Sequence, residues 1–163
     1  MKVIMYMAIS ANGHIEDSNK NTPWSNEEWI GFSNMVKDVG NLVVGKNTYN
    51  IMIKEKEFDK IGNPYTIIIS NTNSLNFIKS PEEAIEKLKE KGFSKILVAG
   101  GSSLNSSFLE KGLVDEIYLD VEPYIFGDGL NLISKSNINL KLELLEINKL
   151  SKNTIQLHYK ILK

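Results

Sequence analysis

The sequence predicts an α/β fold with a mostly parallel central sheet, helices on both faces and an antiparallel hairpin at the C-terminus. Short apolar runs alternate along the chain with segments of helical periodicity, which is typical of βαβ units. The apolar runs are nearly continuous, as in strands covered on both faces. The last two runs are separated by only a few polar residues, which favours a hairpin.

Length and composition fit one domain that spans residues 1–163. The chain is 42% hydrophobic, so it can bury a single sizeable core. With Lys+Arg 19 against Asp+Glu 20 the net charge is −1, and the basic residues are scattered, so we expect no nucleic-acid partner. The absence of cysteine excludes disulfides, thiolate metal ligands and a thiol nucleophile.

The N-terminal apolar segment is too short to span a membrane, and no small-residue cleavage site follows it. We therefore expect a cytoplasmic protein without a membrane partner, acting on a small molecule. His14 and His158 are far apart in the sequence and have no neighbours at metal-ligand spacing, so we expect no metal site.

The first predicted strand is residues 3–9, and the polar residues 16–24 are predicted as a loop. A helix then begins after Ser25, which is a good N-cap, and apolar side chains recur at helical spacing behind it. Glu28 stands three residues after Ser25, as in a capping box. The helix should end near Gly40.

The middle of the chain continues the alternation of strands and helices. Residues 42–45 and 65–69 are predicted strands, with a short helix at 46–52 and a charged connection at 55–63 between them. Ser80 and Pro81 then begin a helix that runs to about residue 91, since they supply a cap and a proline at the first helical position.

Residues 95–120 form the segment around which the chain is organised. A predicted strand at 96–99 leads into Gly100 and Gly101, then a helix at 104–111 and a strand at 114–121, in the order of a βαβ unit. Glycines admit a ligand close to the backbone, and a helix N-terminus favours an anion. The turn is therefore either a phosphate site or only a tight connection between strand and helix.

The C-terminal part is predicted as a loop at 123–129 followed by strands at 140–148 and 154–162. Apolar side chains alternate in the last strand, so one of its faces is solvated or meets a partner.

Four predicted parallel strands end in small or polar residues. These ends are Ser10, Asn12 and Gly13; Gly45, Lys46, Asn47 and Thr48; Ser70 and Asn71; and Gly100, Gly101, Ser102 and Ser103. Ligands on such sheets bind beyond the carboxyl ends of the strands. This shared edge therefore predicts a site for an extended ligand that carries phosphate.

Five segments, taken in order, resemble a known family. They are SANGHI (10–15), VGKNTY (44–49), VAGGSSL (98–104), GLVDEIYL (112–119) and PYIFGDG (123–129). The set is similar to the dihydrofolate reductase-like superfold, and most closely to the C-terminal reductase domain of the bifunctional riboflavin-biosynthesis deaminase/reductase and its stand-alone relatives. The resemblance covers essentially the whole chain and implies a three-layer α/β/α fold.

The resemblance also implies that the cofactor is NADPH and assigns residues to it. The matching positions are Ala8, Ile15, Gly45, Lys46, Asn47, Thr48, Ser70, Asn71, Gly100, Gly101, Ser102, Ser103 and Leu104. In the family, positions 45–48 hold phosphates of the cofactor, 100–104 form the pyrophosphate turn, and positions 8 and 15 hold the nicotinamide amide. The family commonly has arginine where this chain has Lys46, which is a point charge and not a bidentate fork.

The chemistry requires few side chains, because the cofactor supplies the hydride and the protein supplies position and one proton. Folate reductases use an acid on the first helix, so the resemblance implies Glu28 as the catalytic acid. From the residues alone, the favoured interpretation of Glu28 is a capping-box acid, and that of Glu27 is a solvated charge in the first turn. Asp128 is interpreted as a turn acid. Trp24 either lines a pocket or covers the core beside Phe32.

The sequence thus predicts an NADPH-dependent oxidoreductase that transfers a hydride to a small heteroaromatic or carbonyl substrate, similar to the 5-amino-6-(5-phosphoribosylamino)uracil reductases of riboflavin biosynthesis. The alternatives are a dihydrofolate reductase and a non-catalytic nucleotide-binding module on the same fold. We also expect a homodimer, from the alternating strand at 154–162 and the resemblance to dimeric relatives.

Overall fold

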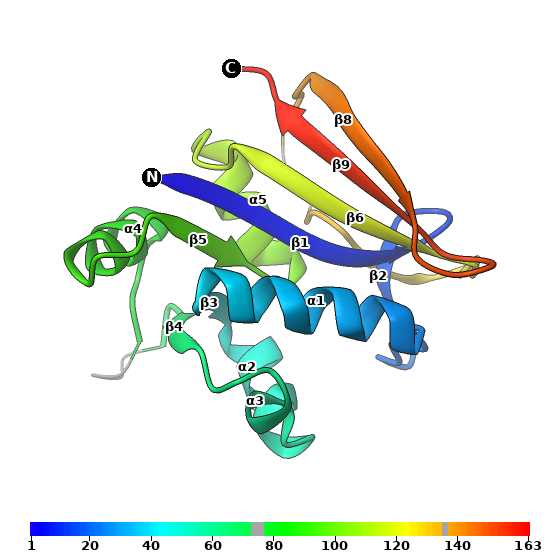
Figure 1. The fold of residues 1–163 in the computed structure, drawn as a ribbon, viewed down its shortest axis with the longest axis horizontal. Coiled ribbons are helices and arrows are strands. Elements are labelled where there is room, and N and C mark those ends of the chain that lie inside the picture. The colour runs from blue at the N-terminus through cyan, green and yellow to red at the C-terminus, as the bar shows by residue number, and fades with distance from the viewer. Residues whose placement is uncertain (73–76, 135–136) are drawn as a thin grey trace.

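The computed structural model describes residues 1–72, 77–134 and 137–163. Its centre is a seven-stranded sheet in the order β4-β3-β5-β1-β6-β9-β8 (Figure 1). Neighbouring strands from β4 to β6 are parallel, and β9 and β8 are antiparallel additions at one side. The predicted mostly parallel sheet with a C-terminal hairpin is confirmed.

The element bounds follow the sequence closely. The strands are β1 (Lys2–Ser10), β2 (His14–Asp17), β3 (Asn41–Gly45), β4 (Tyr65–Ile69), β5 (Lys95–Val98), β6 (Glu116–Glu122), β7 (Gly129–Asn131), β8 (Leu142–Lys149) and β9 (Ile155–Ile161). The helices are α1 (Asn26–Val39), α2 (Lys46–Lys54), α3 (Glu57–Lys60), α4 (Pro81–Glu90) and α5 (Ser102–Glu110).

Three short elements lie where the sequence predicts loops. β2 and β7 pair with each other in a separate two-stranded sheet, and α3 interrupts the charged connection at 55–63. Each has only three or four residues, too few to show a hydrophobic period. The loop prediction is wrong only where it overlaps these elements, at residues 16 and 17 of β2 and at residue 129 of β7, and the pairing of β2 with β7 joins segments that are distant in sequence.

Two core layers lie on opposite faces of the sheet, because alternate side chains of a strand point to opposite faces. Ile4 and Tyr6 of β1 belong to the layer under α1. Val3 and Met5 belong to the layer under α4 and α5. Figure 1 shows α1 on one face of the sheet and α5 on the other, which is the three-layer arrangement that the sequence predicts.

The N-terminus of α1 is capped as predicted, but the capping box is incomplete. Ser25 Oγ accepts a hydrogen bond from the Glu28 backbone N–H at 3.2 Å. In a capping box the Glu28 carboxylate would accept from the Ser25 backbone N–H. Here that N–H donates to Glu122 Oε1 at 3.2 Å. The interpretation of Glu28 as a capping-box acid is therefore wrong.

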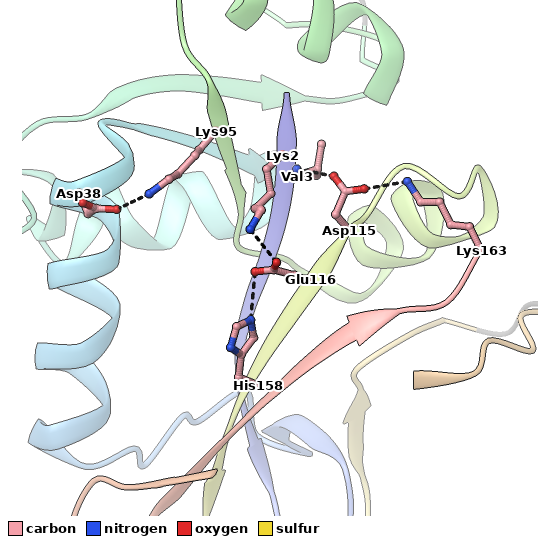
Figure 2. A network of polar contacts seen from close by, with 8 residues as sticks. All are labelled: Lys2, Val3, Asp38, Lys95, Asp115, Glu116, His158 and Lys163. Carbon is pink, nitrogen blue, oxygen red and sulfur yellow. Dashed lines mark hydrogen bonds and ion pairs between the residues drawn. The ribbon is translucent and has the colours of Figure 1, made fainter. Parts of the chain in front are cut away.

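A network of paired charges lies at the amino ends of β1 and β6 (Figure 2). Glu116 accepts from Lys2 Nζ at 2.6 Å and lies 3.0 Å from His158 Nε2. Asp115 accepts from Lys163 Nζ at 2.7 Å. His158 is mostly covered and stacks on a tyrosine ring of β6. These contacts join both chain ends to β6.

Within the described ranges, no helix has the length and apolar character that a membrane span requires.

Candidate active site

The carboxyl ends of β3 and β5 meet at the predicted ligand edge. The Gly45 backbone N–H donates to the Gly100 carbonyl at 2.9 Å. A side chain at Gly45 would begin 3.7 Å from that carbonyl oxygen. The two glycine-containing turns therefore lie in direct contact, as predicted from the two separate motifs.

The turn after β5 requires glycine at its first position. Gly100 has φ +80°, and a Cβ there would lie 2.9 Å from Met7 Cε. The peptide bond between Gly100 and Gly101 is cis. A Cβ on Gly101 would lie 3.7 Å from Thr48 Oγ1 and 4.0 Å from Ile15 Cδ1. The turn therefore lies close to two other predicted cofactor positions, Thr48 of α2 and Ile15 of β2.

The N-terminus of α5 presents unpaired polar atoms beside this turn. Ser102 is 3% exposed, and among the described residues its hydroxyl has no hydrogen-bond partner. Among the same residues, the Asn105 Oδ1 atom also has no hydrogen-bond partner, whereas Asn105 Nδ2 donates to the Leu132 carbonyl at 2.9 Å. Unpaired buried polar atoms are costly, so a partner from a ligand is expected here. A phosphate at a helix N-terminus fits this need.

The other two predicted residues of α5 differ from Ser102. Ser103 is exposed at the helix N-terminus, whereas the Leu104 side chain lies in the core. Leu104 can therefore contribute only its backbone to the site.

Lys46 lies at the N-terminus of α2 and reaches toward the end of β4. Its Nζ donates to Thr72 Oγ1 at 3.4 Å and lies 5.7 Å from the centre of the Phe77 ring. The hydroxyls of Thr72 and Ser70 are 2.6 Å apart. Thr72, which the sequence interpretation did not single out, therefore links Lys46 to Ser70.

The remaining predicted positions lie on the same edge. Asn47 and Asn71 are exposed, while Ala8 in β1 and Ile15 in β2 are buried. The burial of Ala8 and Ile15 is compatible with a role through the backbone only.

Three buried carboxyl groups lie where the first turn of α1 covers the carboxyl end of β6. They are Glu28 (7% exposed), Asp120 (0%) and Glu122 (1%). Tyr6 OH donates to Asp120 Oδ2 at 2.5 Å. Gln156 Nε2 donates to Asp120 Oδ1 at 2.8 Å and to Tyr6 OH at 3.1 Å. Asp120 therefore accepts hydrogen bonds on both oxygens, which favours its charged form.

Glu122 is held in a similar way by the segment before α1. Its Oε1 accepts from Ser25 Oγ at 2.6 Å and from the Ser25 backbone N–H at 3.2 Å. Its Oε2 accepts from Thr154 Oγ1 at 3.5 Å. Glu122 thus fixes the start of α1 against the end of β6.

Burial and like charge control the protonation of this cluster. Burial raises the pKa of Glu28 to about 8, and the charges of Asp120 and Glu122 add to the effect. Burial also raises the pKa of Asp120 to about 6, although the hydrogen bonds from Tyr6 and Gln156 act in the opposite direction. At neutral pH, Glu28 therefore carries a proton and Asp120 is mainly ionised.

Aromatic side chains lie beside the acids. The Trp24 ring centre is 6.3 Å from that of Tyr124 and 6.0 Å from that of Phe126. Phe32 instead contacts the rings of Tyr6 and Trp29. Trp24 therefore belongs to the aromatic group at the end of β6 and not to the core beside Phe32.

The remaining acidic candidate, Asp128, has a local role in its turn. Asp128 is exposed and accepts from the Gly129 backbone N–H at 2.8 Å, as expected of a turn acid. Across the described part of the chain, no three residues among His, Asp and Glu are grouped so that they could bind a metal ion.

The profile of the RibD C-terminal domain family matches residues 1–156. The chain belongs to the RibD C-terminal domain family. The resemblance inferred from the five sequence segments is therefore confirmed, and the fold just described is the fold of this family's reductase domains.

Relatives of this RibD-family chain include stand-alone proteins and parts of longer ones. The uncharacterized protein YwjB of Bacillus subtilis is 25% identical over 169 residues, which cover 97% of each chain. A solved structure of a putative riboflavin biosynthesis protein from Shewanella sp. PV-4 has a TM-score of 0.77 at 20% identity over both full chains. RibD of Acinetobacter baumannii has a TM-score of 0.81 at 16% identity, with 99% of this chain aligned to 58% of that one.

Several polar residues of the RibD-family site were not selected from the sequence. They are Tyr6, Thr72, Asp120, Glu122 and Gln156. The strand at 114–121 was recognised, and acids at alternate positions of a strand point to the same face. That alternation of Asp120 and Glu122 was the available signal. No sequence pattern indicated that the face lies under Glu28.

Proposed function

We propose that this RibD-family protein is an NADPH-dependent reductase that transfers a hydride to a small heteroaromatic or carbonyl substrate, as in the riboflavin-pathway reductases. The observation that carries the proposal is the sheet edge itself. A glycine turn suited to a phosphate follows β5, and β6, two strands away in the sheet, ends under the first turn of α1, which carries the buried, protonated carboxyl of Glu28.

The residues at the ends of β3, β4 and β5 fit NADPH. The unpaired hydroxyl of Ser102 and the adjacent glycine turn would hold the pyrophosphate. Lys46, with the hydroxyls of Ser70 and Thr72, would hold the 2′-phosphate. When bound, the cofactor supplies the hydride. The protein orients it, and Lys46 contributes the charge that favours the phosphorylated form of the dinucleotide.

Glu28 would supply the proton that accompanies the hydride. A general acid works best when its pKa lies near the operating pH. A pKa of about 8 keeps the carboxyl protonated at neutral pH. The residue lies on the first turn of a helix that Glu122 fixes to the sheet, so its position is defined by the scaffold.

A second candidate function is the reduction of a pterin such as dihydrofolate. Its support is the Glu28 carboxyl at the substrate end, to which no described side chain donates a hydrogen bond. Carboxyl groups suit a ring that donates N–H hydrogen bonds better than they suit a phosphate. The chain also has no arginine, because all 19 of its Lys+Arg residues are lysines. A phosphoribosyl substrate would depend on lysine alone.

Titration with NADPH and NADH tests the cofactor half of the site. Lys46→Ala should weaken NADPH binding by about 1–3 kcal/mol, roughly 5- to 150-fold, and leave NADH binding nearly unchanged. Lys54→Ala is the matched control, because it removes the same charge from the last turn of the same helix. Equal weakening of both cofactors would remove Lys46 from this role.

Turnover tests the reductase itself. NADPH oxidation would be followed with a panel of pterins, pyrimidines and quinones. For a substrate that turns over, Glu28→Gln should lower kcat by about 10²- to 10⁴-fold, and Glu27→Gln, its exposed neighbour, should have little effect. Binding of NADPH without oxidation of any substrate would favour a nucleotide-binding module instead.

We also propose a homodimer that uses the hairpin of β8 and β9. Leu144 and Ile147 of the edge strand β8 pair with Tyr159 and Leu157 of β9, so all four lie on one face. Leu144 and Ile147 are about half exposed. Edge strands with apolar faces are natural sites of association. Sedimentation should show a dimer at micromolar concentration, and Ile147→Glu should shift it to monomer. A monomer throughout would contradict the proposal.

A further inference from the structure

The three buried carboxyl groups differ in their hydrogen bonds. Asp120 and Glu122 each accept on both oxygens, from donors on several elements. Among the described residues, no side chain donates a hydrogen bond to the Glu28 carboxyl, although only 7% of the residue is exposed. Donated hydrogen bonds thus hold two of the carboxyl groups in place, whereas the third receives none from a described side chain.

The groups that act electrostatically on Glu28 are all acidic. From β6 they are Asp120 and Glu122, and from α3 the group is Glu57. Tyr6 of β1 is also coupled to Glu28, and burial beside these acids raises the pKa of its hydroxyl, so it remains neutral. Within the described ranges, no ammonium group opposes this negative environment at Glu28.

Helix α1 is packed directly onto the network that holds Asp120. Gly31 lies one turn after Glu28, and a Cβ at Gly31 would lie 2.8 Å from Tyr6 OH and 4.0 Å from Asp120 Oδ2. At its start, the same helix is bonded to Glu122 through Ser25. Contacts before and after Glu28 therefore hold it close to two fixed carboxylates.

We propose that Asp120 and Glu122 are positioning residues that keep the proton on Glu28 at neutral pH, ready for transfer to the substrate. A buried site disfavours a third negative charge next to two existing ones. The proton then resides on the group without stabilising donors, which is Glu28. This inference rests on the proposed reductase function, in which Glu28 is the acid.

The reaction balances with these groups alone and the cofactor. NADPH, when bound, would supply the hydride and Glu28 the proton, and the two would add across one C=N or C=O bond of the substrate, giving NADP⁺ and the reduced product. Glu28 is left as a carboxylate. Solvent returns its proton before the next turnover, and the adjacent negative charges favour that return.

Carbon NMR tests the inference without any turnover. Protein labelled with ¹³C at the glutamate side-chain carboxyls would be titrated, with the Glu28 signal assigned through Glu28→Gln. In Asp120→Asn and in Glu122→Gln, the titration midpoint of Glu28 should fall by about one pH unit or more. Glu116→Gln is the matched control, since it removes an acid from the same face of β6 at the other end of the strand.

An unchanged Glu28 midpoint in folded Asp120→Asn and Glu122→Gln would overturn the inference. If both of these variants fail to fold, the Glu28 titration midpoint in Tyr6→Phe tests the inference instead. It removes a donor that favours ionised Asp120, so Asp120 takes up a proton more readily and the Glu28 midpoint should again fall. An unchanged midpoint in Tyr6→Phe would count against the role of Asp120.

The pH–rate profile adds a second readout once a substrate is known. A shift of one unit would lower the protonated fraction at pH 8 about fivefold, while the rate at low pH should stay close to that of the wild type. A merely structural role would lower the rate at every pH. Failure to find turnover would contradict the proposed function, whereas an unchanged NMR midpoint would contradict only the role of Asp120 and Glu122.

Discussion

Strand β6 carries acidic residues at both of its ends, and the surroundings of these acids differ between the two ends. Glu116, at the amino end, is paired with Lys2 and His158 (Figure 2). Burial opposes its ionisation, but the hydrogen bonds from Lys2 and His158 prevail and lower the pKa of Glu116. Asp120, four residues later on the same face, has its pKa raised to about 6 by burial.

The difference lies in the partners and not in the residue type. At the amino end, the Lys2 ammonium neutralises Glu116 and joins the start of the chain to β6. At the carboxyl end, neutral donors hold Asp120 and Glu122, and the negative charge is not cancelled. Charged groups that are buried without counter-ions are costly, and such perturbed groups cluster at functional sites. We call the amino end of β6 the structural end and the carboxyl end, where the proposed catalytic acid lies, the chemical end.

The largest expected effect is the pH dependence of stability contributed by Glu28. Its folded pKa, about 8, exceeds the ordinary value of 4.5, so its favourable contribution is complete below about pH 4.5 and is lost as the pH rises toward 8. Glu28→Gln removes this loss. Relative to the wild type, the variant should gain roughly 3–5 kcal/mol in unfolding free energy between about pH 4.5 and pH 8.5. Urea unfolding at several pH values measures it.

Glu116→Gln is the control, for which we expect the opposite change in unfolding free energy with pH. Because the pKa of Glu116 is lowered in the folded state, its contribution is present above the unfolded pKa and is lost as the pH falls. The variant should therefore be less stable than the wild type at neutral pH, and the difference should shrink in acid. Parallel pH profiles for Glu28→Gln and Glu116→Gln would contradict the contrast between the two ends of β6.

The sequence predicted most of the fold because the relevant signals are local. Buried parallel strands read as continuous apolar runs, and Ser80 with Pro81 marks the start of α4. The turn at Gly100 and Gly101 is also local, since it is read from four consecutive residues. Elements of three or four residues carry too little pattern, which is why β2, β7 and α3 were not predicted.

The acid cluster could be predicted only in part, because its contacts are distant in sequence. Tyr6 and Asp120 are 114 positions apart, and Gln156 is 36 positions beyond Asp120. Glu28 was selected through the family resemblance, while its local pattern indicated a capping box. Only the structure shows that Glu122 takes the capping hydrogen bond, which leaves the Glu28 carboxyl to the site.

A smaller effect is expected when a neutral donor is removed from the chemical end. Tyr6→Phe deletes the 2.5 Å hydrogen bond to buried Asp120. A hydrogen bond to a charged group contributes about 1.5–3 kcal/mol, so the variant should lose that much unfolding free energy near pH 8. At about pH 5 the loss should be smaller, because Asp120 is then mostly protonated. A loss that is the same at both pH values would show that Asp120 does not depend on this donor.

The smallest effect is expected at the structural end. Lys2→Ala removes the ion pair with Glu116, but the lysine side chain is 48% exposed, so solvent and salt screen the interaction. The variant should lose at most about 1 kcal/mol, and less at high salt. A double-mutant cycle with Glu116→Gln, measured by urea unfolding, isolates the pair. If this cycle gave a larger energy than Tyr6→Phe, the amino end would hold the more strongly coupled acid. The structural end would then be the one that depends on its charges, and the distinction between the two ends of β6 would have to be reversed.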